Sequence, residues 1–302
     1  MTLPLNLKTS IHHFALMPQA RPELNSLAVI VPLYNVMTQR GGDVLQATLG
    51  SIEASLTYFD HKYPQAAAIK AEVVIVDDGS TDNTMEIVEQ FAKDKPNYQL
   101  IKLPMNLGTA AARNLGVKFS QAQALFFCDG DDRFLPEHIF IAFSVLNQAV
   151  PQSYQTQTNP EYFGAVRTGI YTHDSLHPHW QKALENSIPL NLCVRREVHE
   201  FIGGFPEDAV FRDFKYGTED IAYATWLQPF CHQARLGRKT VEYIRYPGSY
   251  FERQLAKFQA PPGTITDDLD PADHVHQMEI NQIIQDRLNK LHQKLSSPEL
   301  VT

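Results

Sequence analysis

The feature that most constrains this chain is a repeated alternation of short apolar runs with longer amphipathic stretches in its first half. Bounded apolar runs are typical of strands buried on both faces, and four occur at 27–33, 73–76, 99–103 and 124–128. Helix-period stretches lie near 44–59, 82–94, 109–119 and 136–149. This order predicts an α/β fold with a mostly parallel central sheet flanked by helices. Ligands of such sheets bind beyond the carboxyl ends of the strands.

The second half of the chain is less regular. Polar residues at 150–161 predict a linker or surface loop, and the acidic, proline-containing stretch 261–273 predicts a second loop. Strands are expected near 163–171, 190–194 and 241–246, with a helix after Gly217. A final apolar stripe predicts a C-terminal amphipathic helix that packs on its own domain, with a partner helix as the alternative. Its members are Val275, Met278, Ile280, Ile284, Leu288, Leu291 and Leu295.

Composition and missing motifs exclude several classes of protein. The net charge of −8 argues against nucleic acid as the main partner. No apolar run reaches the roughly 18–20 residues of a membrane span, so no integral membrane segment and a cytoplasmic location are expected. The three cysteines form no CxxC pair and predict reduced thiols. The chain has no GxGxxG, GxxxxGK[ST], GxSxG or HExxH motif, which disfavours dehydrogenase, P-loop kinase, α/β-hydrolase and zincin functions.

Aspartates follow two of the expected buried strands directly. Asp77 and Asp78 come after one strand, and Asp129, Asp131 and Asp132 come after another. Clustered carboxylates repel one another unless a cation or hydrogen-bond donors offset their charge, and their oxygen atoms suit Mg²⁺ or Mn²⁺. Aspartate also favours turns and helix caps, which is the structural alternative for either cluster alone. Two clusters at one edge of a sheet favour a metal or ligand site.

In their order, six segments resemble the family 2 glycosyltransferases, GT-A enzymes that use nucleotide-sugar donors. They are AVIVPLYN at 28–35, VIVDDGSTDNT at 74–84, NLGTAAARNLG at 106–116, FCDGDDRFLP at 127–136, GGFPE at 203–207 and the pair Glu219-Asp220. The resemblance covers about residues 27–250. It implies an N-terminal extension at 1–26, a GT-A domain at 27–260, and an acidic loop and C-terminal helix at 261–302. Within the domain, 27–135 would bind the nucleotide sugar and 160–260 the acceptor.

The resemblance also implies roles for single residues at the donor site. Pro32, Tyr34 and Asn35 would lie against the nucleoside, where a tyrosine ring suits a base. The Asp78 carboxylate would accept a hydrogen bond from the base edge, which favours uracil, and Asp77 would hold the loop or the ribose.

Further donor-site residues follow from the next two motifs. Gly108 opens a helix that carries Arg113, whose guanidinium suits a phosphate or a neighbouring aspartate. The segment from Asp129 through Gly130 and Asp131 to Asp132 matches the DxD element. It would bind ribose and, through Mn²⁺ or Mg²⁺ on Asp131 or Asp132, the diphosphate, whose charge must be neutralised as it leaves.

The pair Glu219-Asp220 matches the position of the catalytic carboxylates. Asp220 would act as general base, taking the proton of an acceptor hydroxyl in a single displacement with inversion. Taken alone, an acidic first helical turn is also explained by the helix dipole.

The chain departs from the family pattern at three places. Extra sequence lies around 61–70, and no QxxRW element follows Trp226, which disfavours a processive polymerase. The segment YIRYPGS at 243–249 lacks the histidine found in many relatives, so Arg245 and Arg253 are candidates for its charge. Histidines at 173, 177 and 179 are expected in a loop rather than a metal site, with Trp180 as an acceptor platform or a buried anchor.

The sequence therefore predicts a metal-assisted transferase that moves a sugar from a nucleotide-diphosphate donor, preferably a UDP-sugar, to a hydroxyl of a glycan or other acceptor. Polysaccharide biosynthesis is the expected setting, and peripheral association with the inner face of a membrane stays open. One alternative is an inactive scaffold that binds a nucleotide sugar or glycan. A sugar nucleotidyltransferase is disfavoured because residues 31–35 lack its glycine-rich, basic motif.

Overall fold

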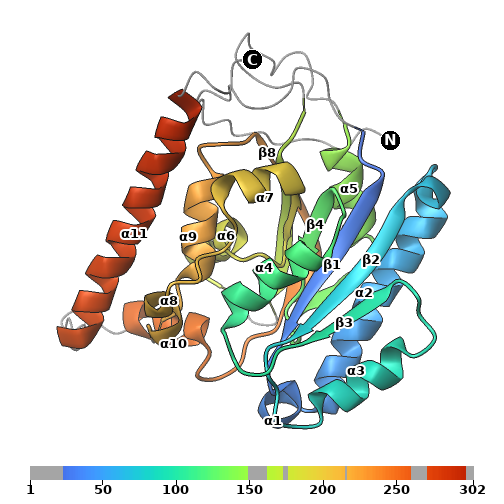
Figure 1. The fold of residues 1–302 in the computed structure, drawn as a ribbon, viewed down its shortest axis with the longest axis horizontal. Coiled ribbons are helices and arrows are strands. Elements are labelled where there is room, and N and C mark those ends of the chain that lie inside the picture. The colour runs from blue at the N-terminus through green and yellow to red at the C-terminus, as the bar shows by residue number, and fades with distance from the viewer. Residues whose placement is uncertain (1–22, 149–161, 173–175, 215, 260–270, 297–302) are drawn as a thin grey trace.

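An eight-stranded sheet runs through the computed structural model, which describes residues 23–148, 162–172, 176–214, 216–259 and 271–296 (Figure 1). Its strand order is β3-β2-β1-β4-β7-β6-β8-β5. Four of the seven strand pairings are parallel and three are antiparallel, the latter all involving β7 or β5. The strands are β1 Ser26–Leu33, β2 Lys70–Asp77, β3 Tyr98–Lys102, β4 Ala124–Phe127, β5 Arg133–Phe134, β6 Ala165–Thr172, β7 Leu192–Arg195 and β8 Gln233–Tyr243.

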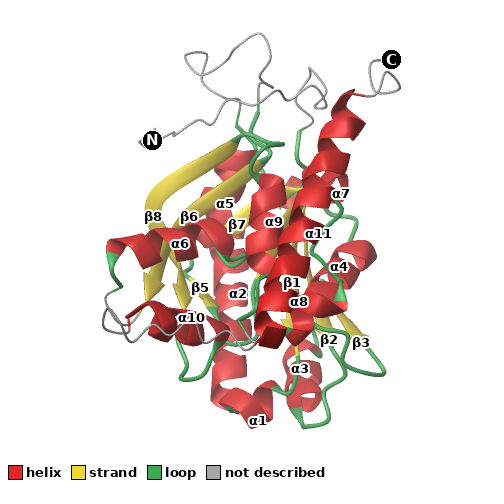
Figure 2. Cartoon of the chain, turned by 90° about the vertical axis from the view of Figure 1, so that its left-hand side faces the viewer, coloured by secondary structure: helices red, strands yellow, loops and turns green. Residues whose placement is uncertain are grey.

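Helices cover both faces of this sheet (Figures 1 and 2). In chain order they are α1 Val36–Arg40, α2 Gly42–Lys62, the 3₁₀ turn η1 Ala66–Ala68, α3 Thr84–Ala92, α4 Thr109–Phe119, α5 His138–Leu146, α6 Pro178–Ser187, α7 Arg196–Ile202, α8 Ala209–Asp213, α9 Glu219–Leu227, α10 Tyr250–Gln259 and α11 Pro271–Ser296.

Two apolar clusters lie on opposite faces of β1, which is buried along its whole length. Val29 and Val31 pack in one cluster with α2, α3 and α5, whereas Ala28 and Ile30 pack in the other with α4, α7 and α9. This alternation is the reason that the strand reads as a continuous apolar run. The α/β fold and the four N-terminal strands are therefore confirmed.

The C-terminal helix α11 packs along α8 and α9 (Figure 1). Ile280 and Leu291 are buried, and Ile284 packs against the same cluster, which confirms that the apolar stripe contacts its own chain. Val275 and Met278 belong to the expected stripe but are exposed, at 62% and 73%. The side chain of Leu295 lies outside the described residues. The domain boundaries at 26, 135 and 260 stay a prediction.

The structure corrects three expectations. Residues 178–180 form the first turn of α6 rather than a loop, because a proline at the first helical position needs no hydrogen-bond partner for nitrogen. Strand β8 begins at Gln233, well before residue 241. It pairs with β6 in parallel, and the register of this pairing shifts near Gly169. Residues 271–273 begin α11 rather than ending a loop. Most of the extension at 1–26, the segment 150–161, His173 and residues 261–270 lie outside the described residues.

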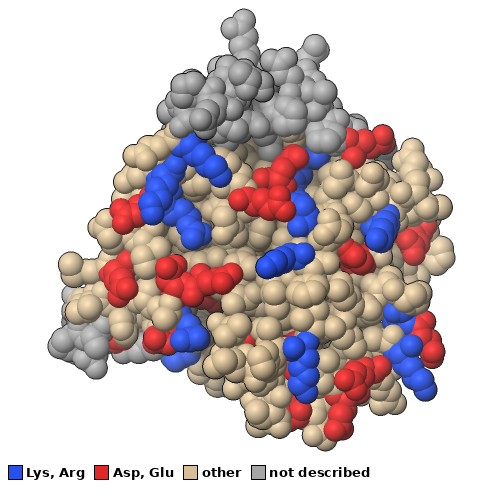
Figure 3. Space-filling view, in the orientation of Figure 1, with Lys and Arg blue, Asp and Glu red and all other residues tan. Residues whose placement is uncertain are grey.

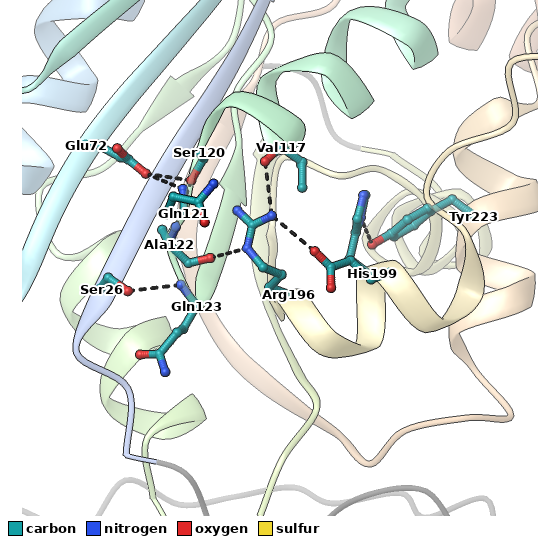
Figure 4. A network of polar contacts seen from close by, with 11 residues as sticks. Ser26, Glu72, Val117, Ser120, Gln121, Ala122, Gln123, Arg196, His199 and Tyr223 are labelled. Atoms are coloured by element: carbon teal, nitrogen blue, oxygen red, sulfur yellow. Dashed lines mark hydrogen bonds and ion pairs between the residues drawn. The ribbon is translucent and has the colours of Figure 1, made fainter. Parts of the chain in front are cut away.

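A polar network lies where β1, β2 and β4 begin and the antiparallel β7 ends, away from the expected ligand edge (Figure 4). Arg196, at the start of α7, donates from Nε to the Ala122 carbonyl at 2.6 Å and from Nη1 to the Val117 carbonyl at 3.1 Å. The Glu72 carboxylate on β2 accepts from the Ser120 hydroxyl at 2.6 Å. These bonds fix α4 and α7 on the sheet.

The visible face of the molecule carries both signs of charge. Lysine and arginine side chains are interspersed with aspartate and glutamate rather than gathered in one patch (Figure 3). Among the described residues, none of the helices combines the length and the apolar character that a membrane span requires.

Helix α4 approaches β1 closely at Gly116, and this contact is testable. A Cβ atom there would lie 2.5 Å from Ile30 Cγ2 and 3.3 Å from Val76 Cγ2. We expect Gly116→Ala to lower the free energy of unfolding by about 1–3 kcal/mol through overpacking. The measurement is urea denaturation.

Gly50, in the middle of α2, provides the matched control. Nothing lies within 4 Å of a Cβ atom there. Gly50→Ala should leave stability unchanged or raise it by up to about 1 kcal/mol, because alanine is the better helix former. Equal effects of the two substitutions would contradict close packing at Gly116.

Candidate active site

The buried Arg113 of α4 joins three segments that are far apart in the sequence. Its Nη2 donates to both carboxylate oxygens of Asp129, at 2.7 and 2.9 Å, and its Nη1 donates to Asp220 Oδ1 at 2.7 Å. Only 1% of Arg113 is exposed. Burial lowers the pKa of Arg113, but Asp129 and Asp220 outweigh it, so the pKa is raised and the guanidinium stays charged. The DxD and ED motifs therefore meet at one cation.

The Asp220 carboxylate lies in the first turn of α9, beside Glu219. Burial raises the pKa of Asp220 to about 7; Arg113 opposes this shift, and Glu219 and Asp129 add to it. Within the described residues, the second carboxylate oxygen of Asp220 accepts no hydrogen bond. A carboxylate with a pKa near neutrality and a free oxygen is suited to accept a proton.

The GGFPE segment supports Arg113 from the other side. The guanidinium carbon of Arg113 lies 5.1 Å from the centre of the Phe205 ring. Asn114, the next residue of α4, donates to the Phe205 carbonyl at 2.9 Å and to Glu207 Oε1 at 2.7 Å. Gly204 has φ +71°, and a Cβ atom there would lie 2.6 Å from Asn114 Oδ1. The double glycine therefore lets this turn reach α4.

The two remaining aspartates of the DxD segment face different partners. Asp131 Oδ2 accepts from Arg40 Nε at 3.0 Å, and the Arg40 guanidinium lies 4.0 Å from the centre of the Tyr246 ring. Asp132 Oδ1 accepts from the Ile244 amide at 3.0 Å. Burial, and then the neighbouring aspartates, raise the pKa of both Asp131 and Asp132. The charged forms of these carboxyls are therefore disfavoured unless a further cation is bound.

The donor set suits a hard divalent cation. Asp131 and Asp132 offer only oxygen atoms, and Mg²⁺ or Mn²⁺ is bound by one or two carboxylates together with phosphate oxygens and water. In the described part of the chain, no three His, Cys, Asp or Glu side chains converge on one metal position. A cation on these aspartates would therefore take its remaining ligands from a bound diphosphate. Its binding would compete with the ion pair between Arg40 and Asp131.

Two loops are tied together at the neighbouring strand ends. Asp78 accepts from the Leu107 amide at 2.7 Å and the Gly108 amide at 2.8 Å. Burial raises the pKa of Asp78, and these two amides partly offset the shift. Asp77 Oδ1 accepts from the Ser80 amide at 3.1 Å. Both aspartates thus hold backbone in place, and a contact of Asp78 with a base stays a prediction.

The loop after β1 contacts the same region. Asn35 has a left-handed backbone with φ 48°, and its side-chain oxygen accepts from the Thr81 amide at 2.8 Å. The Asn35 amide donates to the Ser80 hydroxyl at 2.8 Å. Tyr34 is 40% exposed, and Pro32 lies within β1 opposite Val76. Contacts of these three residues with a nucleoside stay predictions.

Two cavities meet at Asp220. The smaller, of about 460 Å³, is lined by Arg113, by the three aspartates of the DxD segment and by Glu219 and Asp220. The larger, of about 570 Å³, extends from Glu219 and Asp220 past α6 and the start of β8. Ile188, Tyr243 and Tyr250 line both. The proposed base therefore stands at the junction of two spaces.

The smaller cavity includes residues that the motifs did not identify and omits some that they did. Arg40, Tyr243 and Tyr246 line it without a sequence signal of their own, whereas Arg253, a candidate for the missing histidine, lines it as expected. Arg245, the other candidate, pairs instead with Glu252. The residues predicted to contact the nucleoside do not line this cavity. These residues are Pro32, Tyr34, Asn35, Asp77, Asp78 and Gly108.

Comparison with known proteins places the chain in a family. The family model described as "Glycosyl transferase family 2" matches residues 28–193, more than half of the chain. The chain belongs to glycosyltransferase family 2. The match to this family model confirms the resemblance that the sequence segments predicted.

Two curated glycosyltransferases are similar in sequence. AglE of Haloferax volcanii is 27% identical over 210 residues, which is 68% of this chain and 64% of that protein. The uncharacterized glycosyltransferase YibD of Escherichia coli is 32% identical over 112 residues, 37% of this chain and 28% of that protein. The matched part thus spans less than two thirds of either relative.

Two solved structures share the fold. Residues 1–349 of Staphylococcus aureus TarS in complex with UDP align with a TM-score of 0.56 at 19% identity, covering 88% of this chain and 71% of that one. The mannosyltransferase PcManGT of Pyrobaculum calidifontis, in complex with GDP-Man and Mn²⁺, aligns with a TM-score of 0.50 at 16% identity, covering 96% and 76%. The family 2 transferase has the GT-A fold.

Removal of the central cation is the test of this site as a folded unit. We expect Arg113→Met to lower the free energy of unfolding by about 3–5 kcal/mol, because it leaves Asp129 and Asp220 without their buried partner. Chemical denaturation measures the loss. Arg238→Met, which breaks an exposed pair with Glu137, should cost no more than about 1 kcal/mol. If Arg113→Met lowered the free energy of unfolding by no more than the control does, burial of Asp129 and Asp220 would not depend on Arg113.

Proposed function

We propose that this family 2 transferase moves a sugar from a nucleotide-diphosphate donor to an acceptor hydroxyl with inversion, with Asp220 as general base. The observation that carries the proposal is the Arg113 bridge, which sets Asp129 and Asp220 on either side of one guanidinium where two cavities meet. The smaller cavity would hold the diphosphate and the larger one the acceptor.

The geometry around Asp220 supports the proposed base. Arg113 fixes one carboxylate oxygen, which leaves the other to take the proton of the acceptor hydroxyl. The hydroxyl oxygen of the acceptor then bonds to the anomeric carbon, and the bond from this carbon to the diphosphate breaks on the opposite side. The products are an inverted glycoside, a nucleoside diphosphate and a proton on Asp220. Glu219 lies beside Asp220, and its charge supports the raised pKa of that carboxyl.

The charge of the smaller cavity supports a metal-assisted donor site. Five carboxylates line it and three arginines stand against them, so a diphosphate would meet net repulsion without a cation. We propose that Asp131 and Asp132 hold Mn²⁺ or Mg²⁺. When bound, the ion would neutralise charge on the leaving diphosphate. The carboxylates are Asp129, Asp131, Asp132, Glu219 and Asp220, and the arginines are Arg40, Arg113 and Arg253.

A UDP-sugar is the proposed donor, because structures of TarS contain UDP or UDP-GlcNAc. A GDP-sugar is the competing proposal for the donor, because the structure of PcManGT contains GDP-Man. Polysaccharide biosynthesis is proposed as the setting, since one relative, TuaG of Bacillus subtilis, is named for putative teichuronic acid biosynthesis.

Nucleotide binding tests the donor site. Calorimetric titration should show UDP binding that Mn²⁺ strengthens, and an Asp131→Asn/Asp132→Asn double variant should lose the metal effect. Asp213→Asn, an exposed aspartate on α8, is the matched control and should bind like the wild type. Preference for GDP would change the donor class, and binding of no nucleotide with or without Mn²⁺ would overturn the donor site.

Asp220→Asn separates an enzyme from a scaffold. The variant should lose about 10²–10⁴-fold in kcat, because general bases contribute on that scale, and should still bind UDP. Transfer to a glycan acceptor, or hydrolysis of the donor, provides the rate. Unchanged turnover would exclude Asp220 as the base. Nucleotide binding without turnover in the wild type would favour the inactive scaffold.

The raised pKa of Asp220 predicts the acidic limb of the pH profile. The base must be deprotonated, so kcat/KM should rise about tenfold per pH unit up to about pH 7 and then level off. The profile is measured at saturating metal, with the free metal concentration held constant. A flat profile from about pH 5.5 to pH 8 would contradict an essential carboxyl with this pKa.

A further inference from the structure

Two arginines lie side by side at the larger cavity, one in its wall and one buried behind it. Arg167 of β6 and Arg235 of β8 are direct partners in the parallel β6–β8 ladder. Arg235 lines the cavity, and Arg167 is 2% exposed. Like charges directly opposite each other destabilise a sheet unless something compensates them.

Neither arginine has an acidic partner among the described residues. Arg167 Nη1 donates to the Ile188 carbonyl at 2.7 Å and to Asn191 Oδ1 at 2.9 Å, while its Nε and Nη2 are buried without a partner. Arg235 bonds only the Asn186 amide oxygen. The carboxylate that acts on Arg235 from a distance is Glu185, which accepts from Gln181 at 2.8 Å instead.

The pKa values point the same way. Burial, together with repulsion from Arg235, lowers the pKa of Arg167 to about 9, although Tyr223 and Asp220 act in the opposite direction. Burial also lowers the pKa of Arg235. A cation that is desolvated and faces another cation is stabilised by an anion placed against both. The cavity therefore has positive charge at one side that pairs directly with no carboxylate in the described chain.

The rest of the cavity is shaped for a carbohydrate rather than a bare ion. Trp180 and Phe251 line it with their rings 6.4 Å apart, edge to face. A further cation, Lys182 of α6, also lines it, whereas Glu219 and Asp220 line both this cavity and the smaller one. Aromatic walls with a few placed charges are typical of a site that binds and orients a small molecule.

We infer that the acceptor is an anionic saccharide, whose carboxylate or phosphate is bound by Arg235 with Arg167 behind it. This inference rests on the proposed function, because it assigns the larger cavity to the acceptor. Repulsion from Glu219 and Asp220 keeps the anionic group at the basic part of the cavity. The neutral hydroxyl end of the acceptor is then the end that reaches Asp220.

The experiment compares a neutral sugar with two related sugars that carry an anionic group. Saturation-transfer NMR on the full chain with UDP and Mn²⁺ present measures the affinities of methyl β-D-glucoside, methyl β-D-glucuronide and glucose 6-phosphate. We expect the charged sugars to bind more tightly than the neutral one. Preference for the glucuronide or for the phosphate identifies which anion the site takes.

Variants of Arg235 on β8 test whether this residue binds the anionic group. Arg235→Gln should weaken binding of the charged sugars by about tenfold or more, since it removes a charge-assisted hydrogen bond, and should leave the glucoside unaffected. Arg235→Lys should restore part of the affinity. Arg238→Gln, an exposed arginine on the same strand outside the cavity, is the matched control and should bind like the wild type.

The outcomes separate this inference from the proposed function. If UDP fails to bind, the donor site and the proposed function fail. If UDP binds but the three sugars bind equally or not at all, or Arg235→Gln changes nothing, the inference fails alone. A charge preference seen instead in the donor, with UDP-glucuronic acid bound more tightly than UDP-glucose through Arg235, would likewise overturn an anionic acceptor.

Discussion

A buried guanidinium with two carboxylates is the interaction on which the rest of this site depends. Arg113 comes from α4, Asp129 from the end of β4 and Asp220 from the start of α9, and the chain between the last two includes β5, β6, β7 and four helices. A charge this deeply buried is tolerated only while its partners are in place. The bridge therefore makes the first and second halves of the sheet mutually dependent, and it fixes one oxygen of the proposed base.

Close backbone approaches make that bridge reachable. Gly116 lets α4 lie against Ile30 of β1, and Gly204 lets the GGFPE turn reach Asn114 beside Arg113. At Gly130 a Cβ atom would lie 2.4 Å from Leu33 Cδ2, so the DxD loop also lies directly on β1. These glycines act through steric space rather than through chemistry.

Charge divides the two cavities that Asp220 separates. The smaller cavity is rich in carboxylates, which a metal and a diphosphate would satisfy together, whereas the larger cavity is lined by Arg235 with Arg167 beside it, and neither arginine forms an ion pair within the described residues. A donor with its cation and an acceptor with its anion would then enter from opposite sides. Their reacting ends would meet at Asp220, whose pKa burial raises to about 7.

The sequence by itself determined the α/β class, the first four strands and the two motifs that contain Asp129 and Asp220, because apolar periodicity and strand-end aspartates are local patterns. It also predicted a C-terminal helix that packs on its own chain. Only the tertiary structure decided that Arg113 joins those aspartates, that Arg40 contacts Asp131, and that Arg167 lies beside Arg235. The Pro178 helix and the early start of β8 were missed as well. These features depend on which strands become neighbours, and contacts between residues far apart in the chain leave no periodic pattern within either segment.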